Sequence, residues 1–202
     1  MRNAVSDALE ALYGPRWPWN ATFERSLPTA AIGYDPRNDL HNARRRAPTT
    51  GKVIPELKFV FWQKMFTGRY DTRIWDPHLR RVLPNLDPPK SVADLRKQTY
   101  AQLEQVRLLR NRIAHHEPIF NRSLMDDHQT IHDLVAARCS ITAGWLKSYE
   151  RATAIIVNDW ETVDDNDQTE LLDPIKQGVV RDDQVHELGD VFAGDLDALL
   201  VL

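Results

Sequence analysis

The chain has 202 residues, of which 42% are hydrophobic, and a net charge of −3; this length allows one sizeable core and a tail besides. Its single cysteine, Cys139, excludes an internal disulfide framework and a multi-cysteine metal site. No apolar run is long enough to cross a bilayer, and the N-terminus lacks the apolar core of a secretory signal. These features predict a cytoplasmic protein with no membrane partner.

The charge is divided unevenly along the chain. Residues 161–202 hold twelve acids against two bases, a balance of −10, whereas residues 1–160 hold 24 bases and 17 acids, a balance of +7. We therefore expect a folded domain over residues 1–160 and an acidic, largely flexible tail over residues 161–202. The basic domain permits a polyanionic partner. A further hypothesis is that the tail folds back over the basic face and restrains it.

Helical spacing of apolar residues is the main signal in the first half of the chain. Residues 2–13 are predicted to form an amphipathic helix, and residues 36–46 a second one. The segment 15–35 is rich in Pro and Trp and is expected to be loop. The densest apolar run, residues 53–66, predicts one buried helix, with a strand as the less favoured alternative.

The second half continues the helical pattern. Residues 68–84 are expected to form one or two short helices, and residues 92–116 a long helix that Ser91 caps and Pro118 ends. Residues 124–160 form the last helical region, which Gly144 is expected to kink or split. The sequence therefore predicts an all-α fold.

One segment, RLLRNRIAHHEPIF at residues 107–120, combines a basic helical run with two histidines and a proline. Arg110 offers a fixed cation whose planar fork suits phosphate oxygens, and Asn111 follows it directly. His115 titrates near neutrality and can donate or accept a proton. This combination suits chemistry at a phosphodiester.

Other interpretations of these residue types stay open at this point. Arg110 could pair with a carboxylate such as Glu104 or Glu117 while the histidines cap the helix end. His128 and His132 stand four residues apart, a spacing that could hold a metal ion. Because the glutamate of the zinc-protease pattern and a third ligand are missing, we expect no metal site there.

The segment LLRNRIAHHEPIF is similar to the signature of the Abi-like (abortive infection, AbiD/AbiF-type) family, a branch of the HEPN superfamily of all-helical proteins. The similarity extends upstream through ELKFVFWQKMF and RYDTRIWDPHLRRVLP to RNAVSDALEALYGPRW, and downstream to AGWLKSYER, so it covers most of residues 2–151. The resemblance implies a HEPN-like helical bundle with a long motif-bearing helix.

The resemblance also implies a function: a metal-independent endoribonuclease, without a cofactor, that acts in phage defence or as a toxin. Its site would lie where two copies of the Arg/His motif face each other across a homodimer. Carried over by position, the catalytic residues are Arg110 and His115, with Asn111 as polar supporter. The RNA contacts are His116, Arg107 and Arg112.

In the implied mechanism a ribose 2′-hydroxyl attacks the adjacent phosphate and leaves a 2′,3′-cyclic phosphate and a free 5′-hydroxyl. We infer that His115 of the two subunits shares the base and acid roles. Whether a protein or RNA antitoxin is a further partner stays open. The alternative function is a non-catalytic helical module that binds RNA or a protein through the same basic face.

Overall fold

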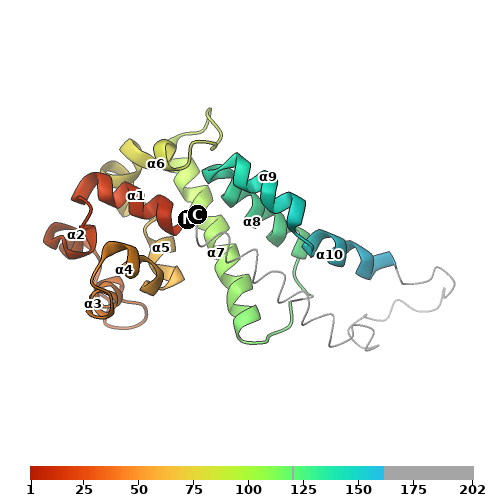
Figure 1. Ribbon diagram of the computed structural model, residues 1–202, viewed down its shortest axis with the longest axis horizontal. Helices are drawn as coiled ribbons and strands as arrows, with labels where there is room; N and C mark the ends of the chain where they lie inside the picture. The colour runs from red at the N-terminus through yellow and green to blue at the C-terminus, as the bar shows by residue number, and fades with distance from the viewer. Residues whose placement is uncertain (120, 162–202) are drawn as a thin grey trace.

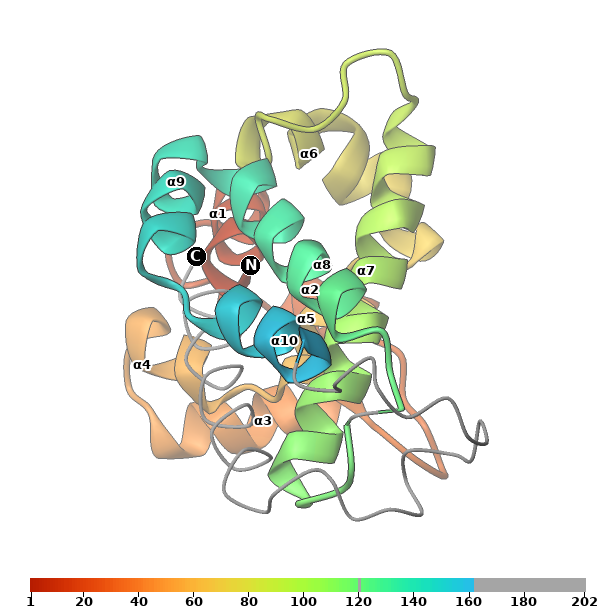
Figure 2. The ribbon, with the colours of Figure 1, turned by 90° about the vertical axis from the view of Figure 1, so that its right-hand side faces the viewer.

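The molecule is organised around one long helix. The computed structural model describes residues 1–119 and 121–161, the side chains of residues 157–161 excepted. Within these residues the chain forms ten α-helices and no strand, which confirms the predicted all-α fold. Helix α7 (Val92–Ala114) lies between the N-terminal helices and helices α8 to α10 (Figure 1 and Figure 2). The predicted flexibility of the acidic tail concerns residues 162–202, which lie outside the described part.

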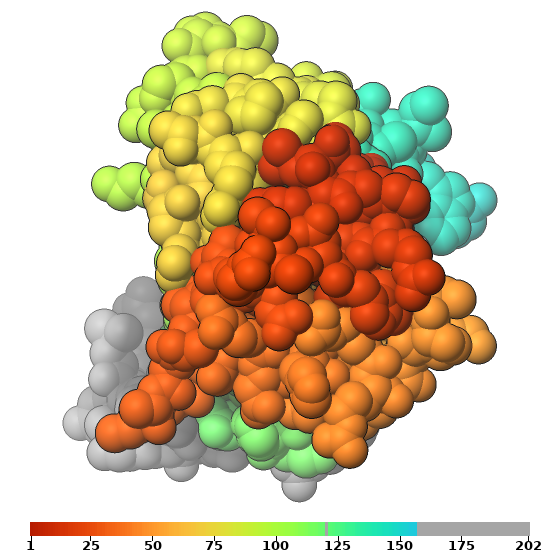
Figure 3. Space-filling view, turned by 90° about the vertical axis from the view of Figure 1, so that its left-hand side faces the viewer, coloured from red at the N-terminus to blue at the C-terminus, as the bar shows by residue number. Residues whose placement is uncertain are grey.

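The N-terminal helices lie on one side of α7 (Figure 1). They are α1 (Arg2–Tyr13), α2 (Ala21–Ser26), α3 (Pro36–Arg46), α4 (Thr50–Glu56), α5 (Phe59–Lys64) and α6 (Asp76–Val82), with the short turns η1 (Trp17–Trp19), η2 (Gly68–Tyr70) and η3 (Asp71–Trp75). The main contacts with α7 come from α5, α6, η2 and η3, and α1 packs against α6. Figure 3 shows the face that they form, with α1 and α2 in red beside the yellow and orange elements. The predicted helices at 2–13 and 36–46 are confirmed with the same bounds.

Two predictions in this half are wrong. Residues 53–66 form two helices, α4 and α5, separated by Leu57 and Lys58 in extended conformation. The backbone N–H of Lys58 donates to Asp39 Oδ2 at 3.2 Å, so the chain here bonds to α3 instead of continuing a helix. Pro55, which has no N–H to donate, lies in the last turn before the break.

The segment 15–35, predicted as loop, contains the short helix α2. Its six residues are too few for a periodic signal, but its cap is clear: Asn20 Oδ1 accepts from the N–H groups of Thr22 and Phe23. Phe23 is buried, and its ring meets Trp17 edge-on at 5.4 Å. Tertiary packing of one aromatic side chain therefore fixes this helix.

The C-terminal half divides into α8 (Leu124–Arg138), α9 (Ser140–Tyr149) and α10 (Ala152–Glu161). The chain breaks at Cys139, in extended conformation, and again at Glu150. Gly144 lies inside α9, so the region is split at Cys139 and Glu150, and the predicted split at Gly144 is wrong. Arg138 holds the first break in place, since its guanidinium donates to Val82 O at 2.8 Å and to Asp7 Oδ2 at 2.5 Å.

The core is rich in aromatic side chains. Trp75 is fully buried, stacks on Phe66 with ring centroids 4.3 Å apart, and donates its indole N–H to Met65 O at 2.7 Å. Helix α7 adds a buried apolar row to the same core: Leu95, Leu103, Val106 and Leu109. No helix in residues 1–119 and 121–161 is long and apolar enough to cross a membrane.

Replacing Trp75 tests this core. Trp75→Ala removes a buried ring and leaves a cavity, so we expect the free energy of unfolding to fall by about 3–5 kcal/mol. Ile32, which is 94% exposed, provides the control: Ile32→Ala should change it by less than about 0.5 kcal/mol. Chemical denaturation followed by circular dichroism measures both. Equal, small effects of the two substitutions would contradict the packing described for Trp75.

Candidate functional site

The segment predicted to carry the chemistry lies at the C-terminal end of α7. The helix begins as predicted, because Ser91 Oγ accepts from the N–H of Asp94 at 3.1 Å. It ends at Ala114, two residues before the predicted end at His116, and His115 caps it. The last turns therefore carry Arg110 and Asn111, and the turn that follows carries His115 and His116.

Two hydrogen bonds define the geometry of this helix end. The N–H of Glu117 donates to Arg112 O at 2.8 Å, and the N–H of His116 donates to Ile113 O at 3.1 Å. This is the Schellman arrangement, in which the residue after the cap takes the left-handed conformation that favours glycine. His116 holds that position with φ of 54°, and the cost is about 1–2 kcal/mol. The two backbone bonds hold His116 in this conformation at the helix end.

The three arginines of the segment are in different environments. Arg107 donates to both carboxylate oxygens of Glu104, at 2.9 and 2.6 Å. Arg112 donates to Pro118 O at 2.8 Å. The side chain of Arg110 is exposed and makes no hydrogen bond or ion pair within the part of the chain that the structure describes. Among those residues, Arg110 is thus the arginine of this segment whose guanidinium has no intramolecular partner.

The alternative in which Arg110 pairs with Glu104 is wrong, because Glu104 is bound by its neighbour. Arg107 lowers the pKa of the Glu104 carboxyl through their hydrogen bonds, and Gln63, which also donates to Glu104, adds to the effect. The same pairing raises the pKa of Arg107. The pair fixes both charges along α7 and against α5, so Arg107, predicted as an RNA contact, already has an intramolecular partner.

The loop after the helix is tied down by a buried carboxylate that the sequence did not single out. Asp127, 2% exposed, accepts two hydrogen bonds from Arg122, at 2.6 and 2.7 Å, and one from Gln105 at 2.9 Å. Gln105 belongs to α7 and Asp127 to α8, so this cluster joins the two helices and the end of the loop. Together with the bond from Arg112 to Pro118 O, it holds the chain at both sides of residue 120.

His115, His116 and Arg110 are exposed on the surface of the single chain, and Asn111 is half-buried. The backbone N–H of His115 donates to Asn111 O at 3.0 Å, but no side-chain hydrogen bond joins Arg110, Asn111 and His115 among the described residues. Five residues of helix correspond to a rotation of about 140°, which directs Arg110 and His115 to different sides of the helix end. In a single chain, the side chains of Arg110 and His115 are therefore both exposed and lie on different sides of the helix end.

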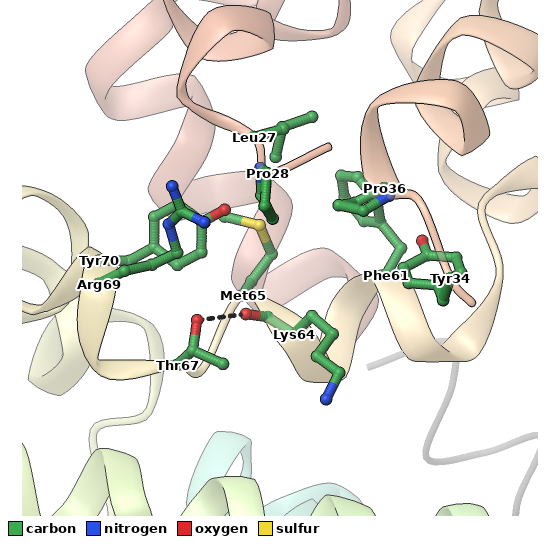
Figure 4. Close-up of a pocket in the computed structure, with 10 residues that line it drawn as sticks. All are labelled: Leu27, Pro28, Tyr34, Pro36, Phe61, Lys64, Met65, Thr67, Arg69 and Tyr70. Carbon is green, nitrogen blue, oxygen red and sulfur yellow. Dashed lines mark hydrogen bonds between the residues drawn. The ribbon is translucent and has the colours of Figure 1, made fainter. Parts of the chain in front are cut away.

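Two cavities of about 290 Å³ each lie away from this segment. The first is mainly apolar, and Figure 4 shows Lys64 with its ammonium group directed away from the apolar side chains that line the cavity. The second is polar and lies around α3. None of their lining residues comes from 107–120, so neither cavity includes the predicted site.

The histidines at 128 and 132 have structural partners. His128 Nε2 lies 3.4 Å from Glu150 Oε2, and His132 Nε2 lies 3.2 Å from Ala143 O. Glu150 also accepts from the N–H of Thr153 at 3.0 Å and caps α10. No group of three or more His, Cys, Asp or Glu side chains placed to hold a metal ion occurs among the described residues. Both histidines thus contribute to the joins between α8, α9 and α10.

Comparison of the chain with protein-family models, with curated proteins and with solved structures yields no match. The assignment to the Abi-like family therefore stays a prediction from the motif.

Replacing Asp127 tests whether its hydrogen bonds hold the loop after α7 against helices α7 and α8. Asp127→Ala leaves Arg122 and Gln105 without their shared acceptor, and we expect the free energy of unfolding to fall by about 2–4 kcal/mol. Amide exchange in the peptides that cover residues 115–123 should also accelerate. Asp133→Ala, at an exposed acid of the same helix, should cost less than about 0.5 kcal/mol. Unchanged exchange in Asp127→Ala would contradict the role given to this cluster.

The strained histidine gives a second test. His116→Gly removes the left-handed penalty, partly offset by the greater entropy of the unfolded glycine chain, so stability should rise by about 0.5–1 kcal/mol. His41→Gly, on the exposed side of α3, is the matched control and should lower stability by a similar amount. Thermal and urea unfolding measure the difference. If both glycines destabilise alike, His116 is not under the strain that its φ indicates.

Proposed function

We propose that this protein is a metal-independent endoribonuclease of the HEPN type that acts in phage defence or as a toxin, with Arg110 and His115 as its catalytic pair. One observation supports it above the others: Arg110 has no partner among the described residues while Arg107 and Arg112 on either side are bound within the chain. An arginine left available beside two exposed histidines is suited to a phosphate ligand.

The chemistry follows from the groups present. A neutral His115 accepts the proton of a ribose 2′-hydroxyl, and the oxygen of that hydroxyl attacks the adjacent phosphorus. The bond from phosphorus to the 5′-oxygen breaks, and a protonated His115 of the second subunit returns a proton to that oxygen. Arg110 stabilises the negative charge that builds on the non-bridging oxygens. Asn111 supports the phosphate as a neutral donor.

Two subunits are part of the proposal because one chain leaves the site open. Arg110 and His115 leave the helix end in different directions, and no described cavity includes them. A second copy that faces the first would supply the opposite wall and the second histidine. His116, at the left-handed position, would contact a phosphate or a base of the same RNA.

Cleavage of total RNA in the presence of EDTA tests the site. We expect Arg110→Ala and His115→Ala each to reduce the cleavage rate by a factor of at least about 100 while the fold is retained, because both side chains are exposed. The matched controls are Arg45→Ala and His41→Ala, which remove exposed side chains of the same types from α3. They should cleave at the wild-type rate.

Mixed dimers of wild type and His115→Ala test the composite site. Such a dimer keeps both arginines but lacks either the base or the acid, so subunit exchange with excess His115→Ala should suppress the activity of wild type, and unchanged activity would contradict a shared site. Stoichiometric RNA binding without turnover, unaffected by His115→Ala, would instead favour the non-catalytic binding module.

A further inference from the structure

Helix α9 has an outward face that is uncharged except for Lys147 at its edge. The face carries two rows of residues at a spacing of four. One row is large and apolar: Ile141, Trp145 and Tyr149, which are 83%, 58% and 70% exposed. The other row is small: Ser140, Gly144 and Ser148, all exposed. The opposite face, through Ala143 and Leu146, is buried against the rest of the molecule.

The solvent-facing side of a surface helix usually carries polar and charged residues. This face of α9 instead carries a row of large apolar side chains. Scattered exposed apolar residues are ordinary, whereas a contiguous apolar row marks a surface that another molecule covers. The rings of Trp145 and Tyr149 contact each other with centroids 5.2 Å apart, so the row is continuous. Trp and Tyr are also the residue types that dominate the energetics of protein interfaces.

The two rows fit each other in shape. Ser140, Gly144 and Ser148 form a groove beside the ridge, and an added Cβ at Gly144 would meet no atom within 4 Å. Ridges of residues four apart pack into grooves of the same spacing on a facing helix. Because ridge and groove lie side by side on one helix, a two-fold axis places each ridge in the groove of the other copy. The face is thus complementary to itself.

We propose that α9 pairs with α9 of a second copy of this chain. With about 150–250 Å² for each large aromatic side chain, the exposed parts of Ile141, Trp145 and Tyr149 offer roughly 450 Å² on each copy. Two copies that covered all of this area would bury roughly 900 Å² from the ridges alone. The groove residues and Lys147 at the rim bring the total to the roughly 1,000–1,200 Å² at which specific interfaces begin.

This interface is separate from the site under the proposed function. Both ribbon views place α9 away from the C-terminal end of α7, where Arg110 and His115 lie (Figure 1 and Figure 2). Pairing through α9 leaves those residues exposed, so α9 assembles the protein without completing the Arg/His site. A chain that pairs through both surfaces forms assemblies larger than a dimer.

Sedimentation velocity of the full chain without RNA tests the pairing. Wild type should be at least dimeric at about 100 µM, and Trp145→Glu should weaken the association by about 30-fold or more. Circular dichroism should stay unchanged, because Trp145 is more than half exposed. Ile32→Glu places the same charge at an exposed isoleucine outside α9 and should associate as wild type does.

Disulfide cross-linking tests the pairing of α9 without introducing a charge at the interface. In a Cys139→Ser background, Gly144→Cys should form an intermolecular disulfide on mild oxidation, because Gly144 is at the middle of the paired face, where the two-fold axis brings equivalent residues of the two copies closest together. An added Cβ at Gly144 meets no atom of its own chain within 4 Å. Gln129→Cys, exposed on α8, should not. Equal cross-linking at the two positions, or unchanged association of Trp145→Glu, overturns the proposal.

A monomeric wild type also overturns it, whether solvent, residues 162–202 or another protein then covers Trp145. Loss of association in Trp145→Glu with RNA cleavage unchanged supports this interface independently of the catalytic proposal. Loss of cleavage in His115→Ala with association unchanged supports only the catalytic one.

Discussion

The whole structure depends on the burial of α7 from both sides. Its 23 residues extend about 35 Å, and Leu95, Leu103, Val106 and Leu109 lie in the core. On one side it contacts α5, α6, η2 and η3, and on the other α8. These contacts leave the helix no freedom to slide or rotate. The end of α7 therefore holds Arg110 and His115 at a fixed place on the surface.

Much of the polar chemistry near that end serves to fix it. Arg107 is bound to Glu104, Arg112 to the Pro118 carbonyl, and Arg122 to the buried Asp127. Only a group outside such pairs is available for a ligand, which distinguishes Arg110 from its neighbours. The histidine in the left-handed position at residue 116 costs stability that a glycine there would not. A backbone conformation that lowers the free energy of unfolding, held in place by well-packed surroundings, is often found at functional sites.

Helices that depend on local signals, such as caps and apolar spacing, could be predicted from the sequence. Chain breaks that depend on contacts between residues far apart in the sequence could not. The Ser91 cap and the apolar spacing in residues 92–116 placed the start of α7 correctly and its end within two residues. The break at Leu57 and Lys58 depends on a bond from the Lys58 N–H to Asp39, nineteen positions before it, and the break at Cys139 depends on the bonds from Arg138 to Asp7 and Val82. Likewise the motif named Arg110, but spacing alone could not show that Glu104 belongs to Arg107. The role of Asp127 was hidden because a buried acid and a solvated acid look alike in a sequence.

We propose that this chain cleaves RNA through the ribose 2′-hydroxyl without a metal ion. A sharp test compares an RNA oligonucleotide that the protein cuts with the same oligonucleotide carrying a single 2′-O-methyl group at the cleaved nucleotide, both in EDTA. The unmodified RNA should be cut to a 2′,3′-cyclic phosphate and a 5′-hydroxyl, and the modified RNA should stay intact at that position. Equal cleavage of both, or cleavage only after a divalent metal is added, would contradict it.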